Sequence, residues 1–291
     1  MMLSMEARAF ISADGKADTS GVATSVPWWS FTKTALSIAL LRLSEAGKID
    51  LDKQVEGKPY TPVQLLRHEA GLPDYGLLAD YHADVEAGRP PWPIDTLLKA
   101  VEADRLRFEP GQGWAYSNIG YREVGRLIEP ASNRPLADAL ADLVFGPAEL
   151  ATARLAAVPA DLANVNMGDA GAYHPGWVYH GLVVGTATDA ARLLWRLLQG
   201  ALVEKKTLSR MLERRPLPQF RSELHPDPAY ALGLALRATN PLDHPIGHTG
   251  SGPGSQIAVF GRHGSVSVVW AASSADVDPT AEVFRILEND R

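Results

Sequence analysis

The sequence predicts a mixed α/β (α+β) fold, in which an antiparallel sheet built from the two ends of the chain is flanked by helices and carries an inserted, mostly helical region. Strand-like alternation in residues 7–12 is followed by Asp14-Gly15, a strong hairpin signal. Helical patterns then dominate the middle of the chain. Beyond residue 228 the hydrophobic period becomes strand-like again.

The chain has 291 residues, which allows one large domain or two smaller ones. We expect segments 1–50 and 200–291 to form an α/β domain that contains the sheet, and segment 51–199 to form a helical domain. A site is expected in the cleft between them.

Composition indicates an ordinary soluble globular protein, with 46% hydrophobic and 21% charged residues. A net charge of -6 and a pI near 5.8 argue against a nucleic-acid partner. The absence of cysteine excludes disulfides, thiol catalysis and cysteine-ligated metals. Residues 1–15 lack the pattern of a secretory signal, and the longest apolar run is too short to span a bilayer, so we predict a cytoplasmic protein without a membrane partner.

The first elements are a strand over residues 7–12, a return strand over 19–26 and a long helix over 34–46. The helix has almost no polar face, which is typical of a helix buried all round. Gly47 is expected to end it. Trp28 and Trp29 precede it and are expected in the core or in a pocket wall.

Helical patterns follow in the middle of the chain. Thr61 as N-cap and Pro62 at the first helical position begin one helix, which ends before Gly71. Thr188 and Asp189 are expected to cap another. The remaining predicted helices span residues 94–103, 119–129, 136–145, 190–198 and 205–214, and loops are expected at 75–93, 156–180 and 215–228.

The last part of the chain is predicted to contain three short strands and a helix. The strands are expected at 230–236, 255–260 and 265–271, with 261–264 as a hairpin between the last two. Residues 279–289 form an amphipathic helical pattern.

Ser30 and Lys33 are the first candidates for chemistry. Residues three apart share a helix face, so a hydroxyl would lie beside an amine, which is a nucleophile beside a base. Burial should lower the pKa of Lys33, and free N–H groups at the helix N-terminus suit an oxyanion. A Ser-x-x-Lys match is expected roughly once or twice by chance in a chain of this size. On its own, the motif also fits a serine that caps a helix and a lysine that is exposed to solvent.

Tyr116-Ser117-Asn118 and His248-Thr249-Gly250 are two further candidate motifs. A phenol beside a lysine can have a lowered pKa and take the proton of Ser30, so Lys33 and Tyr116 are both candidate bases. Asn118 can bond Lys33 and a substrate amide together. Each of these residues also has a structural interpretation: a loop tyrosine, a helix N-cap and a strand-edge histidine.

The order and spacing of the three motifs resemble the serine β-lactamase and penicillin-binding protein superfamily, in its branch of class C β-lactamases, D-alanyl-D-alanine carboxypeptidases and family VIII esterases. Residues 61–72 are similar to the branch's T-x-x-x-L-L-x-H-x-S-G-L segment, with Ala70 in place of the serine. Residues 108–121 are similar to its F-x-P-G…Y-S-N-x-G-Y block. The resemblance runs from about Trp29 to the C-terminus.

This resemblance implies a β-lactamase/transpeptidase-like fold with an acyl-enzyme at Ser30, and it favours Tyr116 as base with Lys33 as its electrostatic partner. The implied oxyanion hole consists of the backbone N–H groups of Ser30 and Ser251, the latter on the strand that follows the third motif. His248, Thr249 and Gly250 would contact substrate beside Asn118. An imidazole at 248 is a weaker carboxylate anchor than the lysine of typical β-lactamases.

We therefore expect a serine hydrolase that acylates Ser30 with an ester or amide and releases the product with water. An esterase or small-amide hydrolase is the leading interpretation, and a D-alanyl-D-alanine carboxypeptidase or β-lactamase is the alternative. The alternative hypothesis outside the enzymes is a catalytically silent relative that binds a ligand in the same cleft. The expected partner is a small ester, amide, peptide or β-lactam, and a homo-oligomer is a further expectation.

Other catalytic constellations do not fit the sequence. There is no G-x-S-x-G elbow, no H-E-x-x-H pair and no glycine spacing for a dinucleotide. We expect neither a metal nor an organic cofactor.

Only 29 residues precede Ser30, whereas the family usually has a longer segment there with a helix that packs on the sheet. We expect the C-terminal helix, an irregular segment or a second subunit to cover that face of the sheet.

Overall fold

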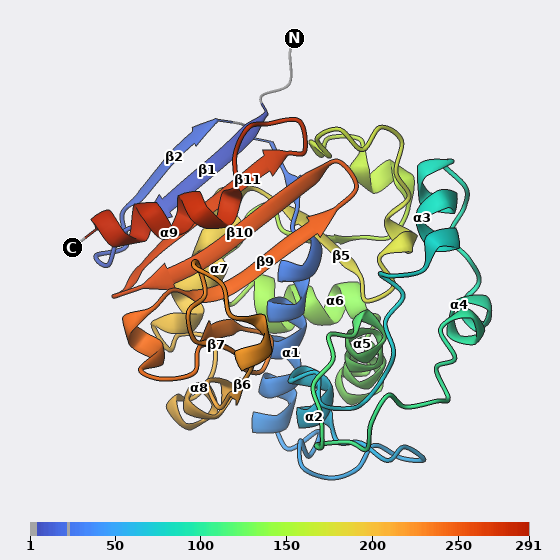
Figure 1. The fold of residues 1–291 in the computed structure, drawn as a ribbon. Coiled ribbons are helices and arrows are strands. Elements are labelled where there is room, and N and C mark those ends of the chain that lie inside the picture. Colours follow the sequence, from blue (N-terminus) through green and yellow to red (C-terminus); the bar gives the residue numbers. More distant parts are fainter. Residues whose placement is uncertain (1–4, 22–23, 291) are drawn as a thin grey trace.

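A computed structural model describes residues 5–21 and 24–290. Within these residues the main element is an eight-stranded antiparallel sheet in the order β2-β1-β11-β10-β9-β8-β7-β6 (Figure 1). Its strands are β1 (Glu6–Ile11), β2 (Ala17–Gly21), β6 (Arg215–Pro216), β7 (Pro228–Tyr230), β8 (Ala235–Arg237), β9 (Ile246–Gly252), β10 (Ser255–Arg262) and β11 (Ser265–Ala272). Both ends of the chain contribute strands, which confirms the predicted fold class.

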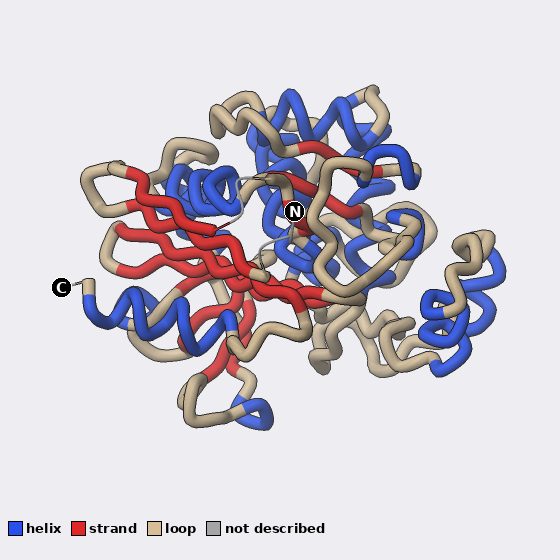
Figure 2. The backbone as a smooth tube through the Cα atoms, turned by 90° about the horizontal axis from the view of Figure 1, so that it is seen from above, coloured by secondary structure: helices blue, strands red, loops and turns tan. Residues whose placement is uncertain are grey.

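Helices cover both faces of this sheet. The helix α7 (Ala187–Leu198) packs on β1, β10 and β11, and α9 (Pro279–Asn289) packs on β10 and β11 from the other side, as Figure 2 shows for α9. Phe284 and Leu287 of α9 join Phe260 and Val269 of the sheet in a separate apolar cluster. The C-terminal helix therefore covers one face of the sheet, as in the first of the three arrangements expected where the family has an N-terminal helix.

The long helix α1 (Thr32–Glu45) runs through the centre of the molecule and packs against α5 (Asn118–Ser132) and α6 (Leu136–Leu140). Its buried residues surround the whole helix, as the sequence predicts. The other helices are α2 (Pro62–Leu66), α3 (Ala79–Glu86), α4 (Ile94–Ala100) and α8 (Lys205–Met211), and a small sheet has the order β3 (Val26–Pro27), β5 (Leu182–Gly185), β4 (Arg154–Ala156).

The helix boundaries agree with prediction at several residues. Gly47 follows α1 with a φ of +68°, a conformation that glycine adopts without strain. Thr61 caps α2 in a capping box with Gln64, and Pro62 is its first residue. The start of α1 differs, because a 3-10 turn over Trp29–Phe31 precedes it. Ser30 lies in this turn.

The start of α7 was predicted wrongly. Thr186, not Thr188 or Asp189, is the N-cap, and its side chain accepts a hydrogen bond from the Asp189 amide. Asp189 lies inside the helix, and its carboxylate accepts from the Thr152 amide at 2.6 Å. A tertiary contact with a preceding loop therefore uses the carboxylate that the sequence assigned to the cap.

The single strand predicted over residues 230–236 is also wrong. β7 ends at Tyr230, the chain turns, and β8 begins at Ala235. Gly233 in this turn has a φ of +77°, and a Cβ there would lie 2.1 Å from the Ser37 hydroxyl oxygen. The turn therefore packs directly on α1.

The loop predicted over 75–93 is wrong in part, because α3 (Ala79–Glu86) lies within it. Other boundaries differ by smaller amounts. The third motif itself lies on β9, so Ser251 belongs to the same strand and not to a following one. The helix predicted over 136–145 is α6 followed by a π-helical turn, Ala141–Phe145. The return strand predicted over 19–26 falls partly outside the described residues.

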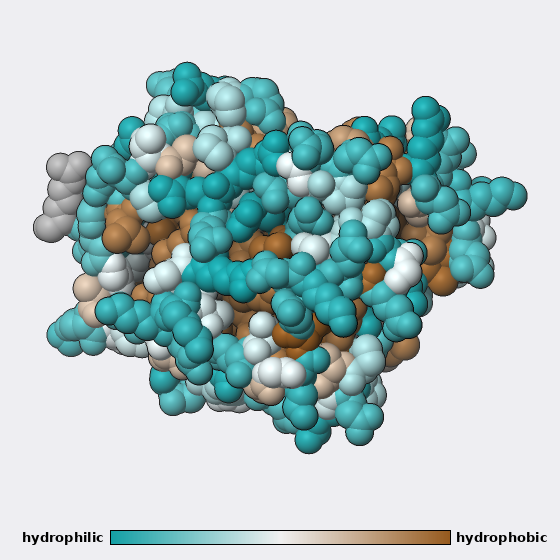
Figure 3. All heavy atoms as spheres, turned by 90° about the horizontal axis from the view of Figure 1, so that it is seen from below, coloured by the Kyte–Doolittle hydropathy of each residue, from teal (hydrophilic) through white to brown (hydrophobic). Residues whose placement is uncertain are grey.

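The described part of the chain contains no helix with the length and apolar composition needed to cross a membrane. Seen from below, the surface is mostly hydrophilic, with apolar side chains visible in hollows between polar ones (Figure 3). The division into an α/β domain and a helical domain stays a prediction, as does the cytoplasmic location.

Candidate active site

Two buried tryptophans hold the turn that carries Ser30. The indole N–H of Trp28 donates to the Gly185 carbonyl at 3.2 Å, and that of Trp29 donates to the Ser255 hydroxyl at 3.1 Å. Trp29 has a φ of +45°, which is a strained conformation for a bulky side chain. The surrounding contacts therefore force the backbone immediately before Ser30 into a fixed and costly conformation.

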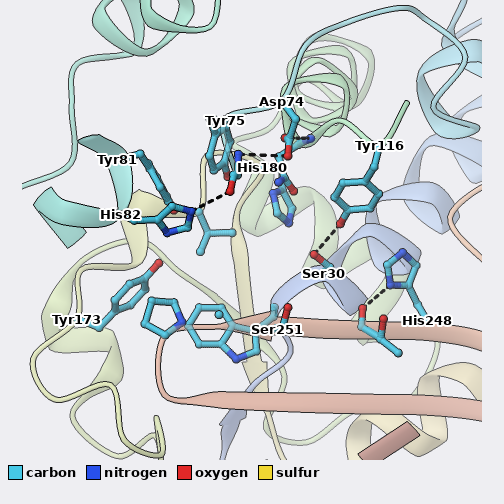
Figure 4. Close-up of a pocket in the computed structure, with 17 residues that line it drawn as sticks. Ser30, Asp74, Tyr75, Tyr81, His82, Tyr116, Tyr173, His180, His248 and Ser251 are labelled. Carbon is cyan, nitrogen blue, oxygen red and sulfur yellow. Dashed lines mark hydrogen bonds between the residues drawn. The ribbon is translucent and has the colours of Figure 1, made fainter. Parts of the chain in front are cut away.

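The structure brings the three predicted catalytic side chains together. The Lys33 Nζ atom lies 3.1 Å from the Ser30 Oγ atom. The Tyr116 hydroxyl lies 2.8 Å from the same oxygen, in the hydrogen bond that a dashed line marks in Figure 4. Ser30 thus contacts an amine and a phenol at hydrogen-bond distance.

Lys33 is fully buried, and this burial lowers its pKa to about 7. The nearby Asp74 carboxylate opposes the shift by favouring the charged form. The Asn118 side-chain oxygen accepts from Nζ at 2.7 Å. A substantial fraction of Lys33 is therefore a neutral amine at neutral pH, as the sequence predicts.

Tyr116 behaves differently from the expectation of a lowered pKa. Burial is the largest effect and raises the pKa of the phenol, and Asp74 raises it further. Lys33 Nζ lies over the face of the ring, 4.8 Å from its centroid. Tyr116 therefore keeps its proton at neutral pH and donates it in the hydrogen bond to Ser30.

Local backbone contacts fix the Tyr-Ser-Asn segment. The Ser117 side chain accepts from the Gly120 amide at 2.9 Å and so caps α5, a role that the sequence offered to Asn118. The Ser117 amide donates to Nδ1 of His68 at 3.1 Å, and the His68 ring lies 4.5 Å from that of Tyr116. His68 therefore supports this segment from below.

On the other side of the cleft, β9 passes beside the turn of Ser30. A Cβ at Gly250 would lie 2.5 Å from the Trp28 carbonyl oxygen and 2.9 Å from the Ser30 nitrogen. Only a residue without a side chain allows this approach. Thr249 and Ser251, on either side of Gly250, are exposed and line the cleft.

His248 is neutral, because burial lowers its pKa to about 3. Its Nε2 atom is 2.9 Å from the Tyr230 hydroxyl, and its Nδ1 atom bonds the Thr249 carbonyl. A carbonyl only accepts, so Nδ1 carries the proton and Nε2 accepts from Tyr230. Both ring nitrogens are therefore occupied inside the protein.

These residues surround a cleft of about 600 Å³. One wall is aromatic, with Trp29, Tyr75, Tyr81 and Tyr173. Among the described lining residues Asp74 is the only carboxylate, and none is a lysine or arginine. The remaining lining residues are Ser30, Gly76, His82, Tyr116, Asn118, Val178, His180, His248, Thr249, Ser251, Gly252 and Pro253, while Lys33 lies buried beneath them.

Sequence reasoning did not find Asp74 or His180. Asp74 accepts from the Asn118 amide at 2.7 Å and from the Gly76 amide at 3.2 Å. His180 lies 3.2 Å from Lys33 Nζ through its Nε2 atom. His180 ends a segment predicted as a loop and Asp74 directly precedes another, and only the tertiary fold brings them to Lys33.

The curated relatives of this chain include a penicillin-binding protein and D-aminopeptidases. Penicillin-binding protein 4* of Bacillus subtilis is 32% identical over 135 residues, which are 43% of this chain and 29% of that protein. A D-aminopeptidase of Cereibacter sphaeroides is 33% identical over 102 residues, 35% of this chain and 20% of that protein. The chain thus matches less than a third of the length of these relatives.

The fold has close structural neighbours. D-amino acid amidase from Ochrobactrum anthropi SV3 superposes with a TM-score of 0.78 and 21% identity, over 99% of this chain and 95% of the amidase. The family model described as Beta-lactamase matches residues 12–288. This match includes all three motifs around the cleft, and the chain therefore belongs to the beta-lactamase family.

Proposed function

We propose that this protein is a serine hydrolase that cleaves amide bonds through an acyl-enzyme at Ser30, with Lys33 as the general base. One observation carries the proposal: the Ser30 oxygen lies within hydrogen-bond distance of a buried amine and of a protonated phenol. The amine can accept the serine proton, and the phenol can donate one. Acylation by an amide needs both steps.

In the proposed acylation, neutral Lys33 takes the proton of Ser30 as the serine oxygen attacks the substrate carbonyl carbon. The backbone N–H groups of Ser30 and Ser251 would stabilise the oxyanion of the tetrahedral intermediate. The C–N bond then breaks, and the leaving nitrogen takes the Tyr116 proton. Protonated Lys33 restores the phenol, so the protein ends this step with Lys33 and Tyr116 neutral.

Deacylation repeats the same chemistry with water. Lys33 takes a proton from the attacking water, the bond between the acyl carbon and Ser30 breaks, and Tyr116 donates a proton to the serine oxygen. Protonated Lys33 then restores the phenol, so both groups end the cycle neutral. The acid product then leaves. Esters would follow the same route with an easier leaving group, so ester cleavage is expected as a secondary activity.

The cleft favours an acyl group that carries a free amine. Asp74 supplies a negative charge, and each of its oxygens accepts one backbone hydrogen bond, which leaves lone pairs for an ammonium group. The aromatic wall of Tyr75, Tyr81 and Tyr173 suits an apolar or aromatic side chain. We therefore propose short amides or peptides of an apolar amino acid as substrates.

The comparisons favour the D configuration, because the relatives and neighbours include a D-aminopeptidase and a D-amino acid amidase. A D-alanyl-D-alanine carboxypeptidase or β-lactamase needs an anchor for a substrate carboxylate. His248 is neutral and both its ring nitrogens are bonded, so it is poorly suited to that role. This is why amide hydrolysis of a free-amine substrate is preferred.

Intact-mass spectrometry tests the nucleophile. The protein is incubated with a fluorophosphonate and, separately, with a penicillin, with Ser30→Ala as the control variant. We expect one fluorophosphonate adduct on the wild type and none on Ser30→Ala. If neither probe labels the wild type, the result would instead support the catalytically silent relative that binds a ligand. A long-lived penicillin adduct would direct attention back to the carboxypeptidase and β-lactamase alternative.

Substrate selection is tested with the amides of D-phenylalanine, L-phenylalanine and N-acetyl-D-phenylalanine. We expect the D-amide with a free amine to be cleaved best, and Asp74→Asn to reduce this preference over the acetylated amide. Equal cleavage of the free and acetylated amides would contradict the role of Asp74. Light scattering tests the homo-oligomer, which stays a prediction.

A further inference from the structure

His180 occupies a position that the proposed reaction has not yet used. It lies in the loop just before β5, is 4% exposed, and lines the cleft. Its Nε2 atom is 3.2 Å from Lys33 Nζ, and its Nδ1 atom is buried. In Figure 4 its ring lies on the side of Ser30 opposite His248. His180 therefore meets the base directly and not through the substrate.

Among the residues that the structure describes, three atoms lie within hydrogen-bond distance of the Lys33 amine: Ser30 Oγ, Asn118 Oδ1 and His180 Nε2. A neutral amine has two hydrogens and one lone pair. The Asn118 oxygen only accepts, so it takes one hydrogen. The lone pair is free for the Ser30 proton only if the second hydrogen goes to His180.

We propose that His180 is a positioning residue that accepts a hydrogen bond from Lys33 and, together with Asn118, directs the amine lone pair toward the Ser30 hydroxyl. This inference rests on the proposed function, because it requires Lys33 to be the base. In the other tautomer, a hydrogen on Nε2 of His180 would point at the lone pair and compete with Ser30.

The surroundings keep the His180 imidazole neutral, which the proposed accepting role requires. Burial is the largest effect that lowers its pKa, and Lys33, His248 and His68 lower it further. The imidazole therefore stays neutral. The titratable groups near Lys33 and His180 are Asp74, His68, Tyr116, Tyr121 and His248, and among these Asp74 acts on Lys33 by favouring its charged form.

The test compares His180→Leu, which cannot accept, with His180→Gln, whose amide oxygen can. The rate of Ser30 labelling by a fluorophosphonate is measured against pH, which needs no knowledge of the substrate. We expect His180→Leu to react roughly tenfold slower or more at high pH. Its half-maximal point should also move to lower pH, because charged Lys33 has lost an acceptor. His180→Gln should restore most of both properties.

His225→Leu is the matched control, because this histidine packs against Phe284 of α9 and does not line the cleft. It should label like the wild type. A His180→Leu variant that labels at the wild-type rate would overturn the proposal, and so would a slower variant with an unchanged pH profile and no rescue by glutamine. An unlabelled wild type would reject the proposed function and this inference with it.

A spectroscopic measurement on the wild type keeps the proposal testable even if His180→Leu does not fold. In ¹⁵N-histidine-labelled protein, the His180 signals are identified by their absence from His180→Gln. We expect Nδ1 to carry the proton and Nε2 to be unprotonated. A protonated Nε2 would overturn the proposal.

Discussion

Tyr116 donates a hydrogen bond of 2.8 Å to the hydroxyl oxygen of Ser30. Burial raises the pKa of this phenol, whereas it lowers the pKa of Lys33 to about 7. The same desolvation thus keeps the proton on Tyr116 and removes it from Lys33. The two groups around Ser30 are therefore divided into a proton donor and a proton acceptor before any substrate binds.

Tyr116→Phe is predicted to impair amide cleavage far more than ester cleavage. The variant keeps the base Lys33 but loses the group that protonates a leaving nitrogen. We expect the kcat for a D-amino acid amide to fall by about 10²–10⁴. Cleavage of a nitrophenyl ester, whose leaving group needs no proton, should fall less than about tenfold. Parallel kinetics with the two substrates check this difference.

Equal losses on the two substrates would show that Tyr116 acts as the base for Ser30, as the family resemblance favoured. The fluorophosphonate gives an independent control, since fluoride also leaves without strong acid assistance. Its reaction with Tyr116→Phe should follow the ester result.

Ser30 labelling is predicted to depend on pH through Lys33. The reactive form is the neutral amine, so the rate should rise with pH and reach half of its maximum near the pKa of about 7. Asp74 favours the charged form of Lys33, so Asp74→Asn should lower this pKa and move the half-maximal point to lower pH. Stopped assays with fluorophosphonate across pH 5–9 provide the profile.

Asp95→Asn, on α4 and outside the cleft, serves as the control for a general change in charge. It should leave the profile in place. A half-maximal point that does not respond to Asp74→Asn would mean that another group controls the reactivity of Ser30.

Some of this site was predictable from sequence because its parts are local. Ser30 and Lys33 share one turn and the start of one helix, and their contact follows from a spacing of three residues. The buried character of α1 and the helix start at Thr61 and Pro62 likewise depend on neighbouring residues. Such features depend on residues that are close together in the sequence, so they can be predicted from it.

The parts that sequence reasoning missed depend on contacts between distant segments. His180 reaches Lys33 across 147 positions of sequence, and nothing in its own neighbourhood indicates this. The opposite pKa shifts of Lys33 and Tyr116 also come from burial, which no motif specifies. The family resemblance identified which residues meet, and the structure indicates which of them holds the proton.

Lys33 is predicted to make the stability of the protein depend on pH. Its pKa is about 7 in the folded protein, whereas the ordinary value of 10.5 applies to the unfolded chain. Between these two pH values the unfolded chain therefore binds one more proton than the folded protein. The free energy of unfolding should therefore rise with pH, by about 1.4 kcal/mol per unit. Below pH 7 the amine is charged in both states and the cost of burying it is fully present.

Lys33→Met removes this titration while it keeps a long apolar side chain. The difference in unfolding free energy between wild type and Lys33→Met should change with pH by the amount given above, in favour of the wild type as pH rises. Urea unfolding at pH 7, 8 and 9 measures it. A constant difference over this range would show that Lys33 has an unshifted pKa in the folded protein.

Gly250→Ala is predicted to abolish most activity by moving β9 away from Ser30. The added Cβ would lie 2.5 Å from the Trp28 carbonyl oxygen, 2.8 Å from the Trp29 Cβ and 2.9 Å from the Ser30 nitrogen. Backbone atoms cannot rotate out of the way as a flexible side chain can, so the strand or the turn must shift. A shift that relieves these contacts would separate the backbone N–H groups of Ser30 and Ser251. Losing one such oxyanion donor costs about 10²–10³ in kcat.

Gly57→Ala is the matched control, because Gly57 has a φ of +69° and an added Cβ would meet nothing within 4 Å. It strains the backbone by roughly 1–2 kcal/mol at an exposed turn far from the cleft in sequence. We expect Gly57→Ala to lower the melting temperature but to label Ser30 at the wild-type rate. Gly250→Ala should label slowly even at temperatures where circular dichroism shows it fully folded, and wild-type labelling by a folded Gly250→Ala protein would refute the proposed contribution of β9 to the oxyanion hole.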